Sequence, residues 1–271
     1  MAPKNISKKT KDIEKEKQIP NWPPLQPLVP SSHLILEPVL TNHIYIIRNL
    51  LTATLCKTYV SFLSGLPFVT TPGKPKKDEA LRVNDRYQIN DAAFAQRLWE
   101  HTALSELVRT YDPDVDADED RDRPDPTMTD GISTDSKAMA LWGGEVLGLN
   151  PNIRIYRYTP GQFFGQHYDE SIQLPFSSPP VKARTTWTLL IYLTTCVGGE
   201  TVFYPESLVK NWNGKGKGKA QHLQQPEPIS VGMEVGMALL HRHGDECLLH
   251  EGKEVKEGEK WVIRSDLVVK K

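Results

Sequence analysis

Two short segments of the chain place a histidine and an aspartate two residues apart: His167-Tyr168-Asp169 and His243-Gly244-Asp245. Side chains alternate between the two faces of a β-strand, so the His and the Asp of such a triplet point to the same side. They can grip one face of a metal ion, and a third ligand must come from a distant strand. Two imidazoles and one carboxylate suit a non-haem Fe(II) ion that keeps open positions for a chelating substrate and oxygen.

The triplet alone is not specific. The chain has 8 histidines and 34 acidic residues among 271, so about one His-x-(Asp/Glu) triplet is expected by chance. The surrounding sequence must therefore decide which triplet carries chemistry.

The first triplet has a distinctive context, with an aromatic segment before it and paired glycines and further charged residues after it. In chain order the segments are Arg157-Tyr158-Thr159-Pro160-Gly161-Gln162-Phe163-Phe164-Gly165-Gln166-His167, Leu190-Ile191-Tyr192-Leu193, Gly198-Gly199-Glu200-Thr201-Val202-Phe203, His250-Glu251-Gly252 and Gly258-Glu259-Lys260-Trp261. Together they resemble the prolyl 4-hydroxylase-like branch of the 2-oxoglutarate/Fe(II) dioxygenases. The resemblance covers roughly residues 150–271, and separate segments agree with it in order and spacing.

The resemblance implies a double-stranded β-helix, or jelly roll. In it, His167, Asp169 and His250 take the metal-ligand positions and are the expected catalytic residues. Tyr158 takes the position of a tyrosine on the strand before the triplet. Tyr192 takes that of a tyrosine which reaches the distal carboxylate of the co-substrate.

Two cations compete for that carboxylate. Lys260 stands ten residues after His250 and precedes an aromatic residue, a pattern similar to that of prolyl 4-hydroxylases. Arg264 lies on the same strand face, and related branches use arginine here. A buried carboxylate needs a fixed cation and further hydrogen bonds to offset its desolvation. Either residue would serve together with Tyr192, and the resemblance favours Lys260.

The cofactors implied by the resemblance are Fe(II), 2-oxoglutarate and O2, with ascorbate to keep the iron reduced. The implied reaction oxidises a substrate and releases succinate and CO2. The resemblance favours a peptidyl-prolyl or other protein side chain as the substrate. A small molecule or nucleobase stays open, because a fold does not determine a substrate.

A zinc-dependent hydrolase is the main alternative. His241, His243 and Asp245 resemble half of a binuclear zinc motif of the metallo-β-lactamase type. That motif needs a histidine directly after the aspartate, where this chain has Glu246, and it belongs to an α/β protein. The sequence therefore predicts that His241 and His243 are loop or rim residues, or residues that support the metal ligands without binding the metal.

A catalytically silent jelly-roll binding module is a third class. Such a module would lack a metal ligand or the cation for the co-substrate. This chain has all three ligands and two candidate cations, which favours an active enzyme.

The composition of the chain argues against nucleic acid and membranes as its main partners. The formal net charge is −1, so no strong field attracts nucleic acid. Cys56, Cys196 and Cys247 show no zinc-finger spacing, and so few cysteines suit a reducing compartment. Neither a signal peptide nor a run of about 18 apolar residues is evident. We expect an intracellular protein, cytoplasmic or nuclear, without a membrane span.

The chain divides into three predicted parts: a flexible polar and Pro-rich tail (1–31), a helical support region with an acidic loop (32–150) and a jelly-roll core (151–271). Apolar spacing predicts a helix over 41–65, and Asn90-Asp91 caps a second helix. Loops are predicted from Asp112 to Asp125 and from Asn211 to Ala220.

From about residue 150 the pattern is that of β-strands. Strands are expected over Ile153–Tyr158, Thr185–Thr195, Glu200–Tyr204, Met233–Leu240 and Trp261–Val269. Helices followed by a run of strands predict an α+β, mainly β fold, in which N-terminal helices support a jelly roll.

Overall fold

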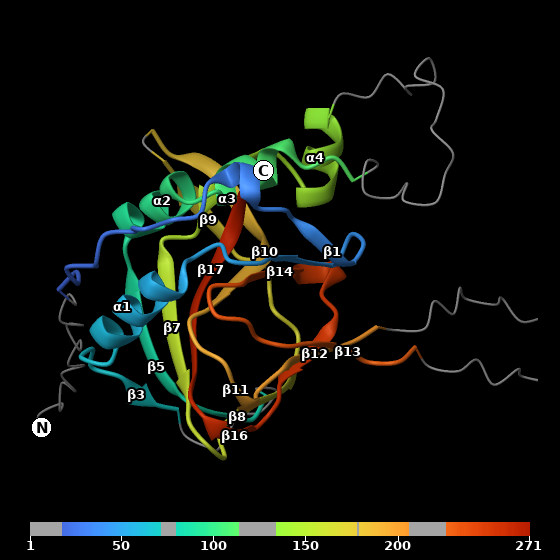
Figure 1. The fold of residues 1–271 in the computed structure, drawn as a ribbon. Coiled ribbons are helices and arrows are strands. Elements are labelled where there is room, and N and C mark those ends of the chain that lie inside the picture. The colour runs from blue at the N-terminus through green and yellow to red at the C-terminus, as the bar shows by residue number, and fades with distance from the viewer. Residues whose placement is uncertain (1–17, 72–79, 114–133, 178, 206–225) are drawn as a thin grey trace, which may run out of the picture.

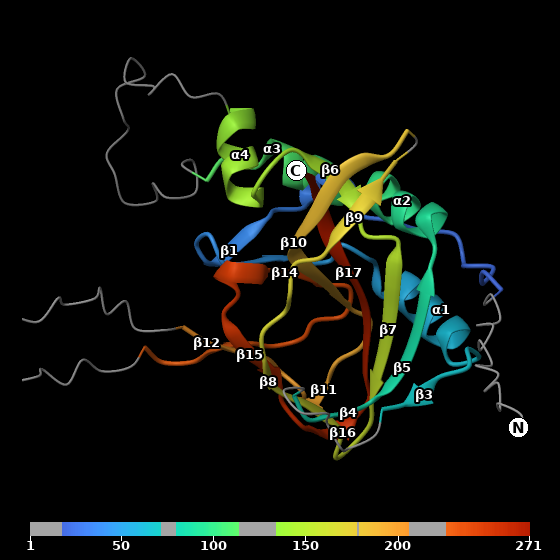
Figure 2. The same ribbon diagram turned by 180° about the vertical axis from the view of Figure 1, so that it is seen from behind.

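Two antiparallel sheets lie face to face in this chain, and helices cover the outer face of the larger one (Figures 1 and 2). The computed structural model describes residues 18–71, 80–113, 134–177, 179–205 and 226–271. The prediction of a mainly β jelly roll with supporting helices is confirmed.

The larger sheet has ten strands among the described residues. Its main path, in spatial order, is β1 (Glu37–Leu40), β2 (Ile44–Ile47), β14 (Ala238–Arg242), β10 (Val181–Tyr192), β17 (Lys260–Lys270), β7 (Asn152–Tyr158), β5 (Asp85–Asn90) and β3 (Val69–Thr70). Off this path, β6 (Val146–Leu149) pairs with β17 and β9 (Gln173–Phe176) pairs with β10. Strands from both sides of residue 150 therefore share one sheet.

The smaller sheet faces the middle of the larger one. Its order is β13 (Ile229–Val231), β12 (Thr201–Tyr204), β15 (Leu249–Gly252), β8 (Phe163–His167) and β4 (Arg82–Val83). A separate pair consists of β11 (Cys196–Gly198) and β16 (Val255–Gly258).

Alternation along the central strands builds two apolar layers. On β17, Trp261 and Ile263 join the core between the large sheet and the helices. Val262 on the same strand packs with Tyr158 and Tyr192 in the core between the sheets. Alternate residues in and just after β10, namely Trp187, Leu189, Ile191 and Leu193, are all buried in the first layer. The second layer thus receives the opposite side chains, which are the ones near the candidate site.

The helices are α1 (Ala53–Leu63), α2 (Ala92–His101), α3 (Leu104–Thr110) and α4 (Thr134–Trp142), with 3-10 turns at Ser31–His33 and Gly244–Glu246. Asp91 caps α2, as predicted, by accepting a hydrogen bond from the Phe94 N–H at 2.9 Å. In the described part of the chain, no helix is both long and apolar enough to cross a membrane.

The helix predicted over 41–65 is wrong in its first part. Residues Ile44–Ile47 form strand β2, and all four side chains are buried. Three of the four are β-branched, which favours a strand that pairs with β14 on one side and β1 on the other. Asn49, with φ of 55°, follows that strand, and α1 begins only after the Thr52 cap.

The tail predicted over 1–31 is wrong for its described residues, 18–31. Trp22 and Leu25 are buried, and the Trp22 ring stacks on Phe94 with 4.0 Å between ring centroids. The Trp22 Nε1–H donates to Asp91 at 2.7 Å. A proline-rich segment has no periodic apolar face. An analysis of apolar periodicity therefore does not detect single side chains, such as Trp22, that anchor the segment to the core.

The other strand predictions are confirmed with shifted ends. The strand expected over Met233–Leu240 begins only at Ala238, because Gly236, with φ of 81°, lies in the turn before it. The predicted Asn211–Ala220 loop and nearly all of the Asp112–Asp125 loop lie outside the described residues.

We predict that Asp91→Ala lowers the free energy of unfolding by about 2–4 kcal/mol. The change removes an N-cap, worth about 1 kcal/mol, and a hydrogen bond from a buried indole to a charged group. Urea denaturation measures the effect. Asp91→Asn keeps an acceptor for the cap and is the control with a smaller loss. Equal stability of Asp91→Ala and the wild type would contradict this role.

Candidate active site

His167 ends strand β8, and Asp169 follows two residues later in the loop after that strand. The predicted common direction of the two side chains is present, with His167 Nε2 3.8 Å from Asp169 Oδ1. Phe164 stacks on the His167 ring at 3.6 Å between centroids and so fixes its orientation.

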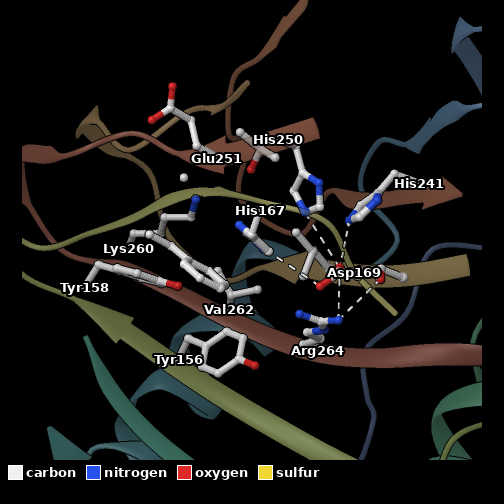
Figure 3. A pocket seen from close by; sticks show the side chains of 15 residues that line it. Tyr156, Tyr158, His167, Asp169, His241, His250, Glu251, Lys260, Val262 and Arg264 are labelled. Carbon is white, nitrogen blue, oxygen red and sulfur yellow. Dashed lines mark hydrogen bonds and ion pairs between the residues drawn. The ribbon is translucent and has the colours of Figure 1, made fainter. Parts of the chain in front are cut away.

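His250 comes from the neighbouring strand β15, directly opposite His167 in the sheet register. Its Nε2 lies 3.7 Å from Asp169 Oδ2. One donor atom from each of these three residues lies within 4.8 Å of the others (Figure 3). The structure therefore brings together the three residues that the resemblance placed at the metal.

Backbone carbonyls fix the tautomers of both histidines. His167 Nδ1 lies 2.8 Å from the Gly165 carbonyl oxygen, and His250 Nδ1 lies 2.9 Å from that of Leu248. A carbonyl only accepts, so each Nδ1 carries the proton. Each Nε2 lone pair is then left for a metal, the usual arrangement for ligating histidines.

The protonation states also suit a cation. Burial lowers the pKa of His167 to about 3 and lowers the pKa of His250, so both imidazoles are neutral near pH 7. Burial alone would raise the pKa of Asp169, but the Arg264 guanidinium and the neighbouring histidines hold it well below its usual range. Two neutral imidazoles and one carboxylate form a facial donor set for Fe(II).

Asp169 is held by residues of the larger sheet. Arg264 on β17 places its guanidinium 2.9 Å from Oδ2, and the Thr188 hydroxyl donates to the same oxygen at 2.8 Å. Thr188 has only one proton to donate, so at 3.0 Å it accepts from His243 Nδ1. His243 Nε2 in turn lies 2.9 Å from the Thr185 hydroxyl. Polar side chains of the large sheet thus position the carboxylate.

Lys260 has a different environment from Arg264. It is buried, its Nζ donates to the Gly199 carbonyl at 2.6 Å, and it forms no ion pair with a carboxylate of the described residues. Its Nζ lies 5.5 Å from the Tyr158 ring centroid and 5.4 Å from that of Tyr192. Burial lowers the pKa of Lys260 to about 8. This cation therefore fits an incoming carboxylate.

Tyr192 and Tyr158 are both buried beside Lys260. The Tyr192 hydroxyl lies 2.8 Å from that of Thr201. Burial raises the pKa of each tyrosine, so both phenols stay protonated and able to donate. Tyr158, Thr201 and Lys260 line the same pocket as the histidines and Asp169.

A second donor group shares His250: His241, Cys247 and His250. Cys247 is poorly suited as a ligand, because burial raises the pKa of its thiol to about 11 and its sulfur accepts from the Asp169 N–H at 3.2 Å. The predicted zinc trio is not assembled. Asp245 is exposed, while His243 bonds to threonines. The hydrolase interpretation is not favoured.

The prediction of a loop or rim position is wrong for His241, which lies on strand β14. His243 lies in the loop after that strand and contacts Thr188, which holds Asp169, so it supports a ligand as the second alternative expected. His241 ends inside the pocket, 2% exposed, with Nε2 3.6 Å from Asp169 Oδ2. The sequence analysis also missed Thr188 and Thr201. Thr188 and Tyr192 both belong to β10 and are four residues apart, so their side chains point to the same face of the sheet. This alternation could have placed Thr188 on the inner face from the sequence alone.

We predict that Co(II) binding follows the His167, Asp169 and His250 group. His167→Ala and Asp169→Ala should abolish stoichiometric binding in an absorption titration, because each removes a ligand. Cys247→Ser is the matched control from the second group and should bind normally. A thiolate-to-cobalt charge-transfer band that disappears in Cys247→Ser would instead place the metal at the second group.

Part of this chain matches a known protein family. Residues 153–265 match the family model described as the 2OG-Fe(II) oxygenase superfamily. Fe(II), 2-oxoglutarate and O2 are the cofactors that go with it, as the sequence resemblance implied. No curated protein matches this chain.

Several solved structures are similar to this chain. A viral collagen prolyl hydroxylase from Paramecium bursaria Chlorella virus-1 is 15% identical, with a TM-score of 0.44 over 84% of this chain and 96% of that one. A prolyl hydroxylase from Trichoplax adhaerens is 17% identical, with a TM-score of 0.47 over 85% of each chain. HygX from Streptomyces hygroscopicus is 14% identical, with a TM-score of 0.47 over 84% of each chain.

The matched segment contains strands β8, β10 and β15, all but the first residue of β7 and part of β17, and with them all three candidate metal ligands. The similarity to the 2OG-Fe(II) oxygenase superfamily therefore covers the part of this chain that holds the candidate site.

Proposed function

We propose that this chain is a hydroxylase that uses His167, Asp169 and His250 to hold Fe(II) and Lys260 to hold the distal carboxylate of 2-oxoglutarate. The observation that carries the proposal is the juxtaposition of three convergent donors with a buried lysine in one pocket (Figure 3). Bound Fe(II) with 2-oxoglutarate and O2 supplies the oxidation, with release of succinate and CO2 and transfer of one oxygen atom to a substrate C–H bond.

The protein residues bind and orient. Lys260 offers a cation, and Thr201, whose hydroxyl lies 2.8 Å from that of Tyr192, offers a hydrogen bond in the same pocket. A dicarboxylic acid anchored there by one end can reach the donor cluster with the other. The buried aromatic residues around it, such as Tyr158 and Phe203, exclude water from the site.

Lys260 is a better partner than Arg264 for that carboxylate. Arg264 already lies 2.9 Å from Asp169 and 3.7 Å from Asp266, whereas Lys260 has only a backbone carbonyl at hydrogen-bond distance among the described residues. A carboxylate at Arg264 would have to displace a metal-binding carboxylate from its cation.

For the substrate we propose a protein side chain, with a prolyl residue as the first candidate, on the strength of the sequence resemblance to prolyl 4-hydroxylases. Ascorbate is the expected reductant for the iron.

We predict that purified protein with Fe(II), 2-oxoglutarate, ascorbate and O2 forms succinate even without added substrate. His250→Ala should abolish this iron-dependent succinate formation, because it removes a proposed ligand. His101→Ala, at the exposed end of α2, is the control and should be unchanged. Succinate formation that survives in His250→Ala would refute the assignment. So would a protein that binds neither Fe(II) nor 2-oxoglutarate.

We predict that Lys260→Met weakens 2-oxoglutarate binding on the order of a hundredfold while it stabilises the free protein. The affinity falls because a buried charge partner is lost. The free protein gains because burial lowers the pKa of Lys260 from 10.5 to about 8. At roughly 1.4 kcal/mol per pH unit, charging this buried amine costs about 3 kcal/mol at pH 7, and the lost bond to Gly199 offsets about 1 kcal/mol of the gain.

The sign of the pH dependence follows from that lowered pKa. The cost is fully present below pH 8 and disappears as pH rises towards 10.5, so the stability advantage of Lys260→Met should shrink over this range. Wild-type affinity for 2-oxoglutarate should fall above about pH 8, where Lys260 of the free protein loses its proton. Urea denaturation and calorimetric titration measure both effects. The exposed Lys256→Met is the control, and unchanged 2-oxoglutarate affinity in Lys260→Met would refute the role of this lysine.

A further inference from the structure

Four arginines gather between the two sheets, beside the candidate metal site: three come from the large sheet and one from strand β4 of the smaller sheet. Arg264 on β17 lies directly opposite Arg154 on β7 in the sheet register. Arg86 on β5 lies opposite Tyr156 on β7, with its guanidinium carbon 6.0 Å from the Tyr156 ring centroid. Arg82 on β4 lies at the same distance from that ring. We call Arg82, Arg86, Arg154 and Arg264 the arginine cluster.

Carboxylates of the described residues neutralise only part of this cluster. Arg154 and Arg264 both contact Asp266, and Arg264 also pairs with Asp169. Arg82 and Arg86 have no ion pair with a carboxylate among the described residues, and Arg86 donates instead to the Gln88 amide oxygen. Like charges directly opposite each other destabilise a sheet, so four cations around two carboxylates need an explanation.

Several donors of the cluster are unused. The Nε–H groups of Arg86, Arg154 and Arg264 are buried, and none has a hydrogen-bond partner within the described parts of the chain. Arg264 is only 9% exposed, and this residue reaches into the pocket beside Asp169. A buried donor without an acceptor costs free energy, which an incoming ligand with several anionic oxygens would recover.

On the outer face of the same strands, an arginine is paired with a carboxylate, so the strands themselves do not require an excess of positive charge. Arg157, one residue after Tyr156, points the other way and donates twice to Asp85, at 2.9 and 2.6 Å. The charge of Arg157 on β7 is thus neutralised by a carboxylate on the neighbouring strand β5. On these two strands, the arginine without an ion pair among the described residues, Arg86, lies on the face towards the metal site.

The cluster is also within reach of that site. Arg82 places its guanidinium carbon 4.8 Å from the Phe164 ring centroid, and Phe164 stacks on His167. Tyr156 and Arg264 line the pocket together with His167 and Asp169 (Figure 3). Although burial alone would raise the pKa of Tyr156, the four arginines lower it, as expected where positive potential is concentrated. Arg82, Arg86 and Arg154 are half-buried, so a ligand can approach them from solvent.

We infer that the oxidised substrate carries a carboxylate or phosphate group, which Arg82 and Arg86, the two members of the arginine cluster without an ion pair among the described residues, bind beside the metal site. This inference rests on the proposed function for the reaction, but the anion site itself does not depend on it. The cluster differs from the Lys260 part of the pocket. Lys260 and Arg264 lie on either side of Val262 in strand β17; the Lys260 Nζ lies over the Tyr158 and Tyr192 rings, whereas Arg264 pairs with Asp169 and Asp266. Arginine forks suit both anionic groups, because each offers paired oxygens.

Calorimetric titration of inorganic phosphate and of acetate tests this site, in sodium chloride at constant ionic strength. The protein is loaded with Mn(II) and saturating 2-oxoglutarate, so that the metal and Lys260 are occupied. We expect one equivalent of phosphate or acetate to bind, and the preferred anion identifies the substrate group. Arg82→Gln and Arg86→Gln should each weaken binding about tenfold, the effect of one lost charge-assisted contact. Arg109→Gln, exposed on α3, is the matched control and should bind as the wild type does.

A second titration separates this inference from the proposed function. Lys260→Ala without metal or 2-oxoglutarate should still bind the anion, even if the chain forms no succinate. Absence of anion binding by the wild type would overturn the inference, as would unchanged affinity in a folded Arg82→Gln/Arg86→Gln double variant. Loss of binding in Lys260→Ala would likewise overturn it, since the anion would then occupy the lysine site.

Discussion

The structure around the site depends on one buried negative charge, the carboxylate of Asp169, which is 7% exposed. Burial of a carboxylate is costly unless charges and hydrogen bonds compensate it. Here Arg264 supplies the charge, and a chain of hydrogen bonds through Thr188 and His243 to Thr185 supplies the orientation. The His167 and His250 rings converge on the same carboxylate from the opposite sheet. Asp169 thus links the two sheets, and a cation bound there would strengthen that link.

This arrangement explains why the central strands differ so strongly between their two faces. On β17, Trp261 and Ile263 are apolar and pack against the helical layer, whereas Lys260 and Arg264 project between the sheets. The apolar face keeps the strand rigid, and rigidity allows charged side chains to be held in fixed positions on the other face. Burial of Trp22 against α2 extends the same support to strand β5, because Asp91 follows that strand and caps the helix.

Part of the fold and of the candidate site could be predicted, because the sequence carries strong local signals for them. The β-strand pattern after residue 150 and the Asp91 cap were readable from the sequence, and the family resemblance named His167, Asp169 and His250. The apolar run from Ile44 to Ile47 was misread as helix, because its pairing with β14 is a contact across almost two hundred residues that no local period reveals. His241 was misplaced for a related reason: its burial depends on the sheet opposite. The arginine cluster escaped notice altogether, since its members come from β4, β5, β7 and β17.

The two cations on β17 show how position divides their roles. Burial lowers the pKa of Lys260, which lacks a carboxylate partner among the described residues, while nearby Asp169 and Asp266 outweigh burial and raise that of Arg264. A lysine can remain in such a place at a cost that a ligand can later offset, whereas a guanidinium stays charged and must be matched at once. Arg264 is therefore suited to permanent support of Asp169, and Lys260 to a partner that comes and goes. A binding site for an exchangeable co-substrate needs the second kind of residue.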